Sequence, residues 1–150
     1  MRQASRPSSI IGALALAFGA LAMSTGAYAT GDKATYDQAK AQAEANYKTA
    51  KAQCDSMSGN AKDVCKEEAK ATMKKAEAKA EADYKGTPKA VYDARVDSAE
   101  ADYKVAKERC DDQSGKAKDA CVKEAKATLA KAKADAKAER DSHATTMKNK

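Results

Sequence analysis

The chain is 150 residues long, and its 28 Lys and Arg against 22 Asp and Glu give a net charge of +6. It has no Trp and a single Phe, and large aliphatic residues are scarce after residue 29. Such a chain cannot bury a sizeable core or easily line an apolar substrate pocket, which argues against an ordinary globular enzyme.

The first 29 residues have the pattern of a secretory signal peptide. Arg2 and Arg6 supply a positive start, residues 10–23 are apolar, and Ala27-Tyr28-Ala29 presents small residues at both positions that a signal peptidase reads. We expect cleavage before Thr30 and a periplasmic or secreted location of the Gram-negative bacterial type. The alternative is a retained anchor, because the segment is just long enough to span a bilayer.

The rest of the chain consists of two tandem copies of one unit. A shift of 56 residues aligns 33–82 with 89–138 at 29 identities in 50 positions, including both cysteines of each unit. Gly86-Thr87-Pro88 separates the copies, with Thr87 suited to cap a helix and Pro88 to begin it. We therefore expect an all-α protein with repeats over 30–86 and 87–140 and a flexible tail over 141–150.

Ala, Lys and Glu favour helices throughout both units, and a Gly interrupts each unit at its centre. These features predict four helices, at about 33–57, 60–85, 88–113 and 116–140. Small and aromatic residues recur at alternating steps of four and three along each helix, which is typical of a coiled-coil seam. The expected seam positions are 36, 40, 43, 47, 50, 54 and 57 with 65, 69, 72, 76 and 80, and their counterparts 56 residues later.

The four cysteines indicate helical hairpins. Within one continuous helix, residues eleven apart lie about 16 Å from each other along the axis, too far for a disulfide. A hairpin that folds at the central Gly brings the two cysteines to matching depths on facing helices. Of three possible connectivities, we therefore expect the local one, Cys54–Cys65 and Cys110–Cys121.

Other chemical uses of these residues fit the sequence less well. Zinc sites favour closely spaced cysteine pairs with further Cys or His, and the one His, His143, lies outside both repeats. No C-x-x-C redox pair and no nucleophile, phosphate or metalloprotease motif is present. We expect no catalytic residues, no metal and no cofactor.

The most basic stretch lies near the end of the second repeat. Its lysines could contact a polyanion such as lipopolysaccharide or a cell-wall polymer, although lysines on exposed helices often serve solubility alone. The candidates are Lys123, Lys126, Lys131, Lys133 and Lys137. Nucleic acid is not expected as a partner because the stretch has no aromatic residues on which bases could stack.

Two Ala-rich runs, KAEAKAEADYK at 75–85 and AKATLAKAKADAKAE at 125–139, resemble the helical stalk of TolA-like cell-envelope proteins. The resemblance is one of composition and implies an envelope-associated helical protein. TolA-like proteins keep an N-terminal anchor and carry a globular C-terminal domain, and we expect neither here. No binding residue is carried over.

The sequence thus predicts an exported, non-enzymatic protein that acts as an envelope spacer or binds an envelope protein. The alternatives are a periplasmic holdase for unfolded clients and a polyanion-binding protein. We expect no membrane span after cleavage, and self-association is plausible because thin seams leave helix faces to share.

Overall fold

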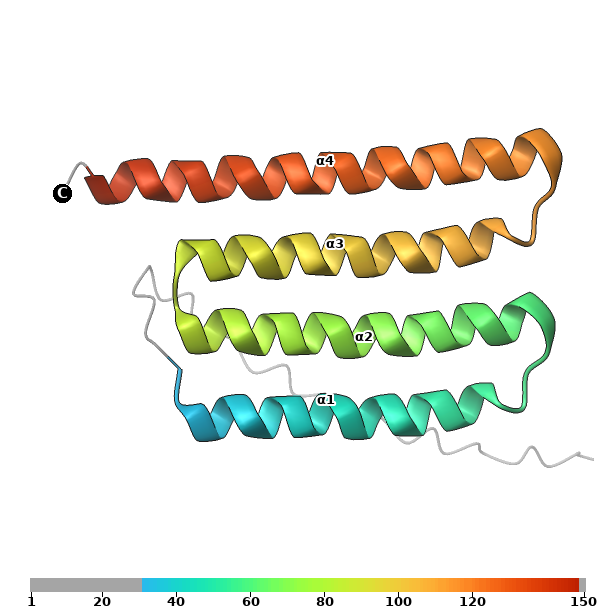
Figure 1. Cartoon of the computed structure of the whole chain (residues 1–150), viewed down its shortest axis with the longest axis horizontal. Helices are drawn as coiled ribbons and strands as arrows, with labels where there is room; N and C mark the ends of the chain where they lie inside the picture. Colours follow the sequence, from blue (N-terminus) through green and yellow to red (C-terminus); the bar gives the residue numbers. More distant parts are fainter. Residues whose placement is uncertain (1–30, 149–150) are drawn as a thin grey trace, which may run out of the picture.

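The computed structural model describes residues 31–148, which form four helices in an antiparallel row (Figure 1). They are α1 (Lys33–Cys54), α2 (Gly59–Lys85), α3 (Pro88–Cys110) and α4 (Gly115–Lys148). Within this described part, each helix packs only against its neighbours in sequence, and α1 does not touch α4. The expected fold class, two tandem helical hairpins, is confirmed.

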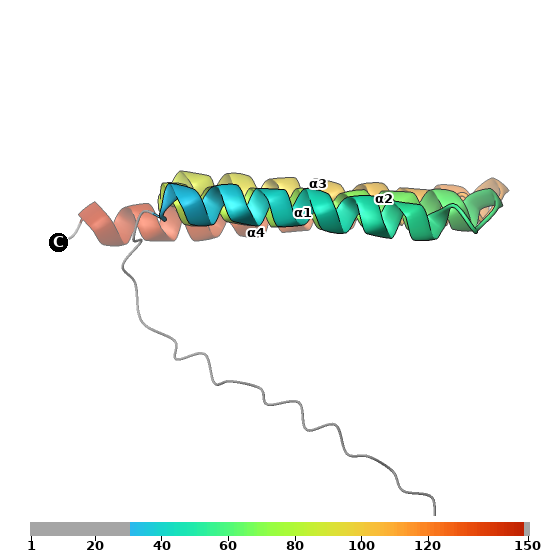
Figure 2. The same cartoon turned by 90° about the horizontal axis from the view of Figure 1, so that it is seen from below.

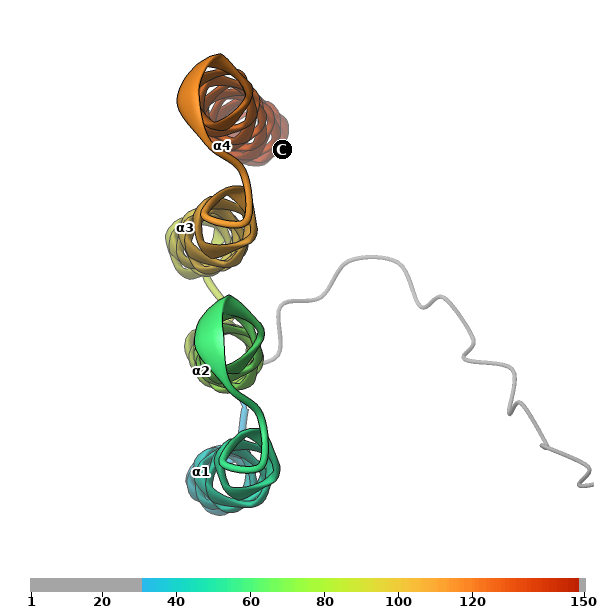
Figure 3. The same ribbon diagram turned by 90° about the vertical axis from the view of Figure 1, so that its right-hand side faces the viewer.

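The four helices form a single flat layer. Seen from below, the row is about as thin as one helix (Figure 2), and seen end-on the helices stand in single file (Figure 3). The bundle therefore does not close around a central core. Within residues 31–148, no other element covers the broad faces of the layer or the outer sides of α1 and α4.

Local sequence signals place the helix ends. Asp32 caps α1 by accepting a hydrogen bond from the Thr35 amide at 3.1 Å. Thr87 caps α3 in the same way, and Pro88 follows as its first helical residue. Gly59 and Gly115 begin α2 and α4 with φ of +58° and +53°, a left-handed conformation that an L side chain disfavours. Each central Gly thus reverses the chain.

Three helix ends differ from the sequence expectation. α1 and α3 end at Cys54 and Cys110, three residues early, because the residues after each cysteine form the turn. α4 continues to Lys148 instead of ending near residue 140. Hydroxyl groups in this last part of α4 donate hydrogen bonds to carbonyls three or four residues earlier, as Thr145 does to Asp141. Polar residues that often end a helix thus find their hydrogen-bond partners inside this helix.

The seams inside the two hairpins follow the expected pattern. Ala43, Ala69 and Ala80 are buried between α1 and α2, and Ala125 and Ala136 are buried between α3 and α4. Tyr36, Tyr47, Tyr92 and Tyr103 are half-buried. Five residues that were expected in the seams are exposed, namely Met57, Thr72, Ala76, Gln113 and Thr128. Met57 and Gln113 lie in the turns beyond α1 and α3.

A third seam, between α2 and α3, was not expected. Its centre is a buried cluster of Ala71, Ala101 and Val105. Two ion pairs flank the cluster, Lys75–Asp102 at 2.7 Å and Arg109–Glu68 at 2.6 Å. This seam joins the two hairpins into one row.

The buried side chains are almost all small. Among the described residues the core consists of alanines, Val105, Cys54 and Cys110, and it contains no buried polar side chain. Burial stabilises by about 25 cal/mol per Å² of apolar surface, so each Ala adds much less than a Leu would. The close approach of the helices depends on this small size.

We predict that Ala71→Leu, on the seam between the hairpins, lowers the free energy of unfolding by about 1–3 kcal/mol because the seam has no room for a larger side chain. The matched control is Ala127→Leu. Ala127 occupies the same repeat position on α4 but is exposed, so in dilute, monomeric solution this variant should be about as stable as the unmodified chain. Urea unfolding followed by circular dichroism measures both. Equal losses in the two variants would contradict a tightly packed seam.

Candidate functional site

The turn between the helices of each hairpin is closed by a disulfide. Cys54 bonds to Cys65 and Cys110 to Cys121, with 5.7 Å between the Cα atoms in both bonds. The described residues contain no free cysteine. The pairing expected from the sequence is confirmed. Cys54 and Cys110 are fully buried, so the bonds lie within the seams.

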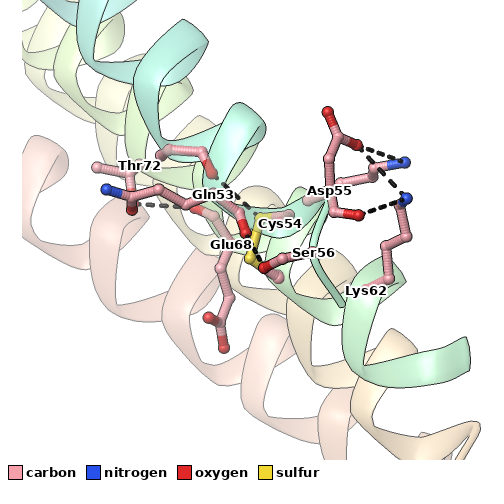
Figure 4. The surroundings of a disulfide bond; sticks show 10 residues. Gln53, Cys54, Asp55, Ser56, Lys62, Glu68 and Thr72 are labelled. Atoms are coloured by element: carbon pink, nitrogen blue, oxygen red, sulfur yellow. Dashed lines mark hydrogen bonds and ion pairs between the residues drawn. A yellow bond between two sulfur atoms is a disulfide. The ribbon is translucent and has the colours of Figure 1, made fainter. Parts of the chain in front are cut away.

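An ion pair supports each disulfide-closed turn. Lys62, near the start of α2, reaches back to Asp55 with 3.5 Å between the charged groups (Figure 4). The second repeat has the same pair, Lys118–Asp111, at 2.9 Å. There the Lys118 ammonium holds the pKa of the Asp111 carboxyl below its usual range, and the carboxylate raises the pKa of Lys118.

Aromatic contacts hold the opposite end of each hairpin. Tyr36 stacks on Tyr84 with 5.1 Å between ring centroids. At the equivalent positions of the second repeat, the Arg140 guanidinium lies over the Tyr92 ring at 4.6 Å. The amide of Gly31 donates to the Asp83 and Tyr84 carbonyls at 3.1 Å, which ties the start of the described chain to the end of α2.

A groove of about 960 Å³ runs along α3 between α2 and α4. Its apolar surface comes from alanines together with Val91, Tyr103 and Leu129. Charged side chains of both signs stand around it. Several are already engaged within the chain, such as Asp102 with Lys75 and Arg95 with Glu139. A ligand would therefore gain mainly apolar contact.

Small side chains on α3 keep this groove open. Ala94 and Ser98 line it, whereas the first repeat carries Gln38 and Gln42 at the same positions. The two repeats have therefore diverged at the residues that shape this surface. The sequence pattern alone does not predict the groove, because the groove depends on α2 packing beside α3.

The five candidate polyanion-contacting lysines lie on α4 in different settings. Lys131 pairs with Asp135 and Lys133 with Glu100, each at 2.6 Å. Within residues 31–148, Lys123, Lys126 and Lys137 form no ion pair. Helical periodicity places these last three and Lys133 on one face of α4, and Lys131 on another. Polyanion binding by these five lysines stays a prediction.

Only some of the remaining predictions from the sequence concern residues that the structure describes. Ala27, Ala29 and Thr30, the expected cleavage residues, lie outside the described residues. In the described part, no group of three or more His, Cys, Asp or Glu is arranged to hold a metal ion. His143 lies 3.9 Å from Glu139 on α4. No helix between residues 31 and 148 is long and apolar enough to cross a bilayer.

Comparisons with protein-family models, with curated proteins and with solved structures each found no match to this chain. The resemblance to TolA-like proteins therefore stays a prediction.

We predict that replacing one disulfide, as in the double variant Cys54→Ser/Cys65→Ser, lowers the free energy of unfolding by about 3 kcal/mol. This loss corresponds to the conformational entropy that the unfolded chain regains when the cross-link is absent. Because both disulfides span a separation of 11 residues, Cys110→Ser/Cys121→Ser should cost a similar amount. Denaturant unfolding measures both. A midpoint that does not move in either variant would show that the helices hold together without the cross-links.

We predict that Lys118→Ala raises the pKa of Asp111 towards its ordinary value, because the ion pair that lowers it is removed. A carboxyl whose folded-state pKa is depressed stabilises the fold above its unfolded pKa, and this contribution disappears as the pH falls through the folded pKa. The effect on stability should be small because the pair is solvent-exposed. NMR titration of the Asp111 side chain measures the shift. Lys116→Ala, which removes a nearby exposed lysine, should leave the titration unchanged.

Proposed function

We propose that this chain is an exported, non-enzymatic helical protein of the cell envelope that binds a helical segment of a partner protein. The observation that carries the proposal is the groove along α3, set in a layer that two disulfides stiffen. Disulfides persist in oxidising compartments, which supports export. The groove supports a binding function for the protein.

The shape of the groove favours a helix as its occupant. It follows the axis of α3, its floor is made of small side chains such as Ala94 and Ser98, and its walls are the parallel flanks of two helices. Amphipathic helices bind in apolar grooves of this kind through residues spaced three and four apart. Because many of the surrounding charges are paired within the chain, we expect the apolar face of the partner to supply most of the affinity.

The spacer role is compatible with the same fold. α4 has 34 residues and is therefore about 50 Å long at 1.5 Å per residue. A flat layer of this length could hold two envelope components apart while the groove binds one of them.

The groove also gives some support to the holdase alternative, because it is an apolar surface that an unfolded client could use. A holdase would suppress the aggregation of a reduced, unfolding client protein when present in stoichiometric amounts. The matched variant below, with its groove filled, should lose this activity if the groove is the client site. The polyanion alternative would instead show salt-dependent retention on an anionic matrix, lost when Lys123, Lys126 and Lys137 are changed to Gln.

The groove is tested by filling it with the residues that the first repeat already uses. We predict that Ala94→Gln/Ser98→Gln keeps the helical content and both disulfides, because α1 carries Gln at the same positions. A photo-reactive amino acid at Leu129, on the groove wall, should give a discrete cross-linked protein in the envelope of the source cell, and the double variant should lose this cross-link.

Two results would count against the proposal. One is cross-linking that the filled groove does not change, and the other is the same product from a photo-reactive residue at the exposed position Ala130. Export is tested separately by the intact mass of the protein from the periplasmic fraction. A chain that begins at Thr30 supports it, and a chain that keeps residues 1–29 contradicts it.

A further inference from the structure

The outer side of α4 repeats the surface by which α2 binds α3. On α2 this surface comprises the residues at the buried and ion-paired positions of the seam between the hairpins, namely Glu68, Ala71, Lys75, Ala78 and Ala82. A step of 56 residues leads to the same five residue types on α4, namely Glu124, Ala127, Lys131, Ala134 and Ala138. We call this second set the α4 edge. All five of its residues are exposed.

The outer side of α1 is the counterpart of the surface of α3 that meets α2. On α3 this surface includes Ala90, Ala101, Asp102, Val105 and Arg109. The equivalent residues of α1 are Ala34, Ala45, Asn46, Thr49 and Gln53, which we call the α1 edge. These residues are also exposed. The chain therefore carries both halves of its own central seam, unpaired, on its two outermost helices.

We propose that the α4 edge of one copy binds the α1 edge of a second copy, in the register in which α2 binds α3. The occupant of each edge is therefore this same chain. An interface of the same residue types is already present inside the molecule between α2 and α3, and the association requires neither the groove nor a particular location of the protein.

The polar contacts of the internal seam have weaker counterparts in this assembly. Lys75–Asp102 becomes Lys131 opposite Asn46, whose amide oxygen can accept a hydrogen bond from the ammonium. Glu68–Arg109 becomes Glu124 opposite Gln53, whose amide can donate to the carboxylate. Both internal ion pairs thus become neutral-to-charged hydrogen bonds.

Two further features make the association weaker than the internal seam. Val105 is replaced by Thr49, which removes apolar surface from the centre of the contact. Lys131 already pairs with Asp135 in the free chain and must turn towards the second copy or share its contacts. We therefore expect reversible association that strengthens with concentration.

The geometry of this contact fixes the kind of assembly. Because the two edges differ, the contact is head-to-tail, and each bound copy leaves one free edge of each kind. Copies would add side by side and extend the flat row of helices. In repeat proteins, units added in this way form a quasi-one-dimensional array.

Two variants, each with one edge blocked, test the proposal by sedimentation of the mature chain over a series of concentrations. Ala134→Arg places an unpaired charge on the α4 edge, and Ala45→Arg places one on the α1 edge. Each alone should lower the association constant by about tenfold or more, because a charge enters a contact that offers it no partner. Ala130→Arg is the control, since α2 has Lys74 at that repeat position, outside the seam.

Mixing the two blocked variants separates the possible modes of association. Each retains the edge that the other lacks, so the mixture should form dimers and nothing larger, whereas the unmodified chain should continue beyond the dimer. If the Ala45→Arg variant alone forms a dimer as tightly as the mixture does, α4 pairs with α4, and the proposal is overturned. An unmodified chain that stays monomeric at every soluble concentration would also overturn it.

A third variant tests the register. The triple change Asn46→Asp, Thr49→Val and Gln53→Arg gives the α1 edge the residues that α3 uses against α2. It should associate at least about tenfold more tightly than the unmodified chain, since it restores two ion pairs and a buried Val. Association that is unchanged or weaker would contradict the proposed register. Circular dichroism and a non-reducing peptide map confirm that each variant folds with its disulfides.

Discussion

Each helical hairpin depends on a disulfide that closes a turn in which a glycine reverses the direction of the chain. The seams consist of alanines with half-buried tyrosines, so apolar burial contributes little per residue and the layer has no second side to pack against. The cross-links compensate by restricting the unfolded chain. They also fix the register of each hairpin, because Cys54 and Cys65, and likewise Cys110 and Cys121, must lie at matching depths. The ion pairs and aromatic contacts at either end follow from that register.

The sequence was sufficient to predict the hairpins, because helix propensity, two glycines and a cysteine spacing of eleven all point to the same turn. It was not sufficient for the seam between hairpins. α2 carries alanines on two sides, and a pattern of small residues does not say which neighbour each side will meet. Ala71, Ala78 and Ala82 could only be assigned once α3 was seen beside them. The groove escaped prediction for the same reason, since the residues that line it come from three helices.

Divergence between the two repeats shows where the molecule has specialised. The cysteines are the same in both copies, and so are the Asp, Ser and Gly of each turn, which are Asp55, Ser58 and Gly59 in the first copy. The copies differ at Ala94 and Ser98, which open the groove, and at Asp102, Val105 and Arg109, which strengthen the central seam. The second repeat thus carries the groove and the residues of the tighter junction, while α1 carries a more polar version of the α3 surface at the edge of the row.

The most direct test of this account is amide hydrogen exchange, helix by helix, on the oxidised and the reduced protein. Among the four described helices, α1 and α4 each contact a single neighbour, so the disulfides should matter most for these two helices. The account predicts that reduction speeds exchange in α1 and α4 more than in α2 and α3, which keep the seam around Ala71 and Val105. Equal protection before and after reduction, or the greatest loss in the two central helices, would contradict it.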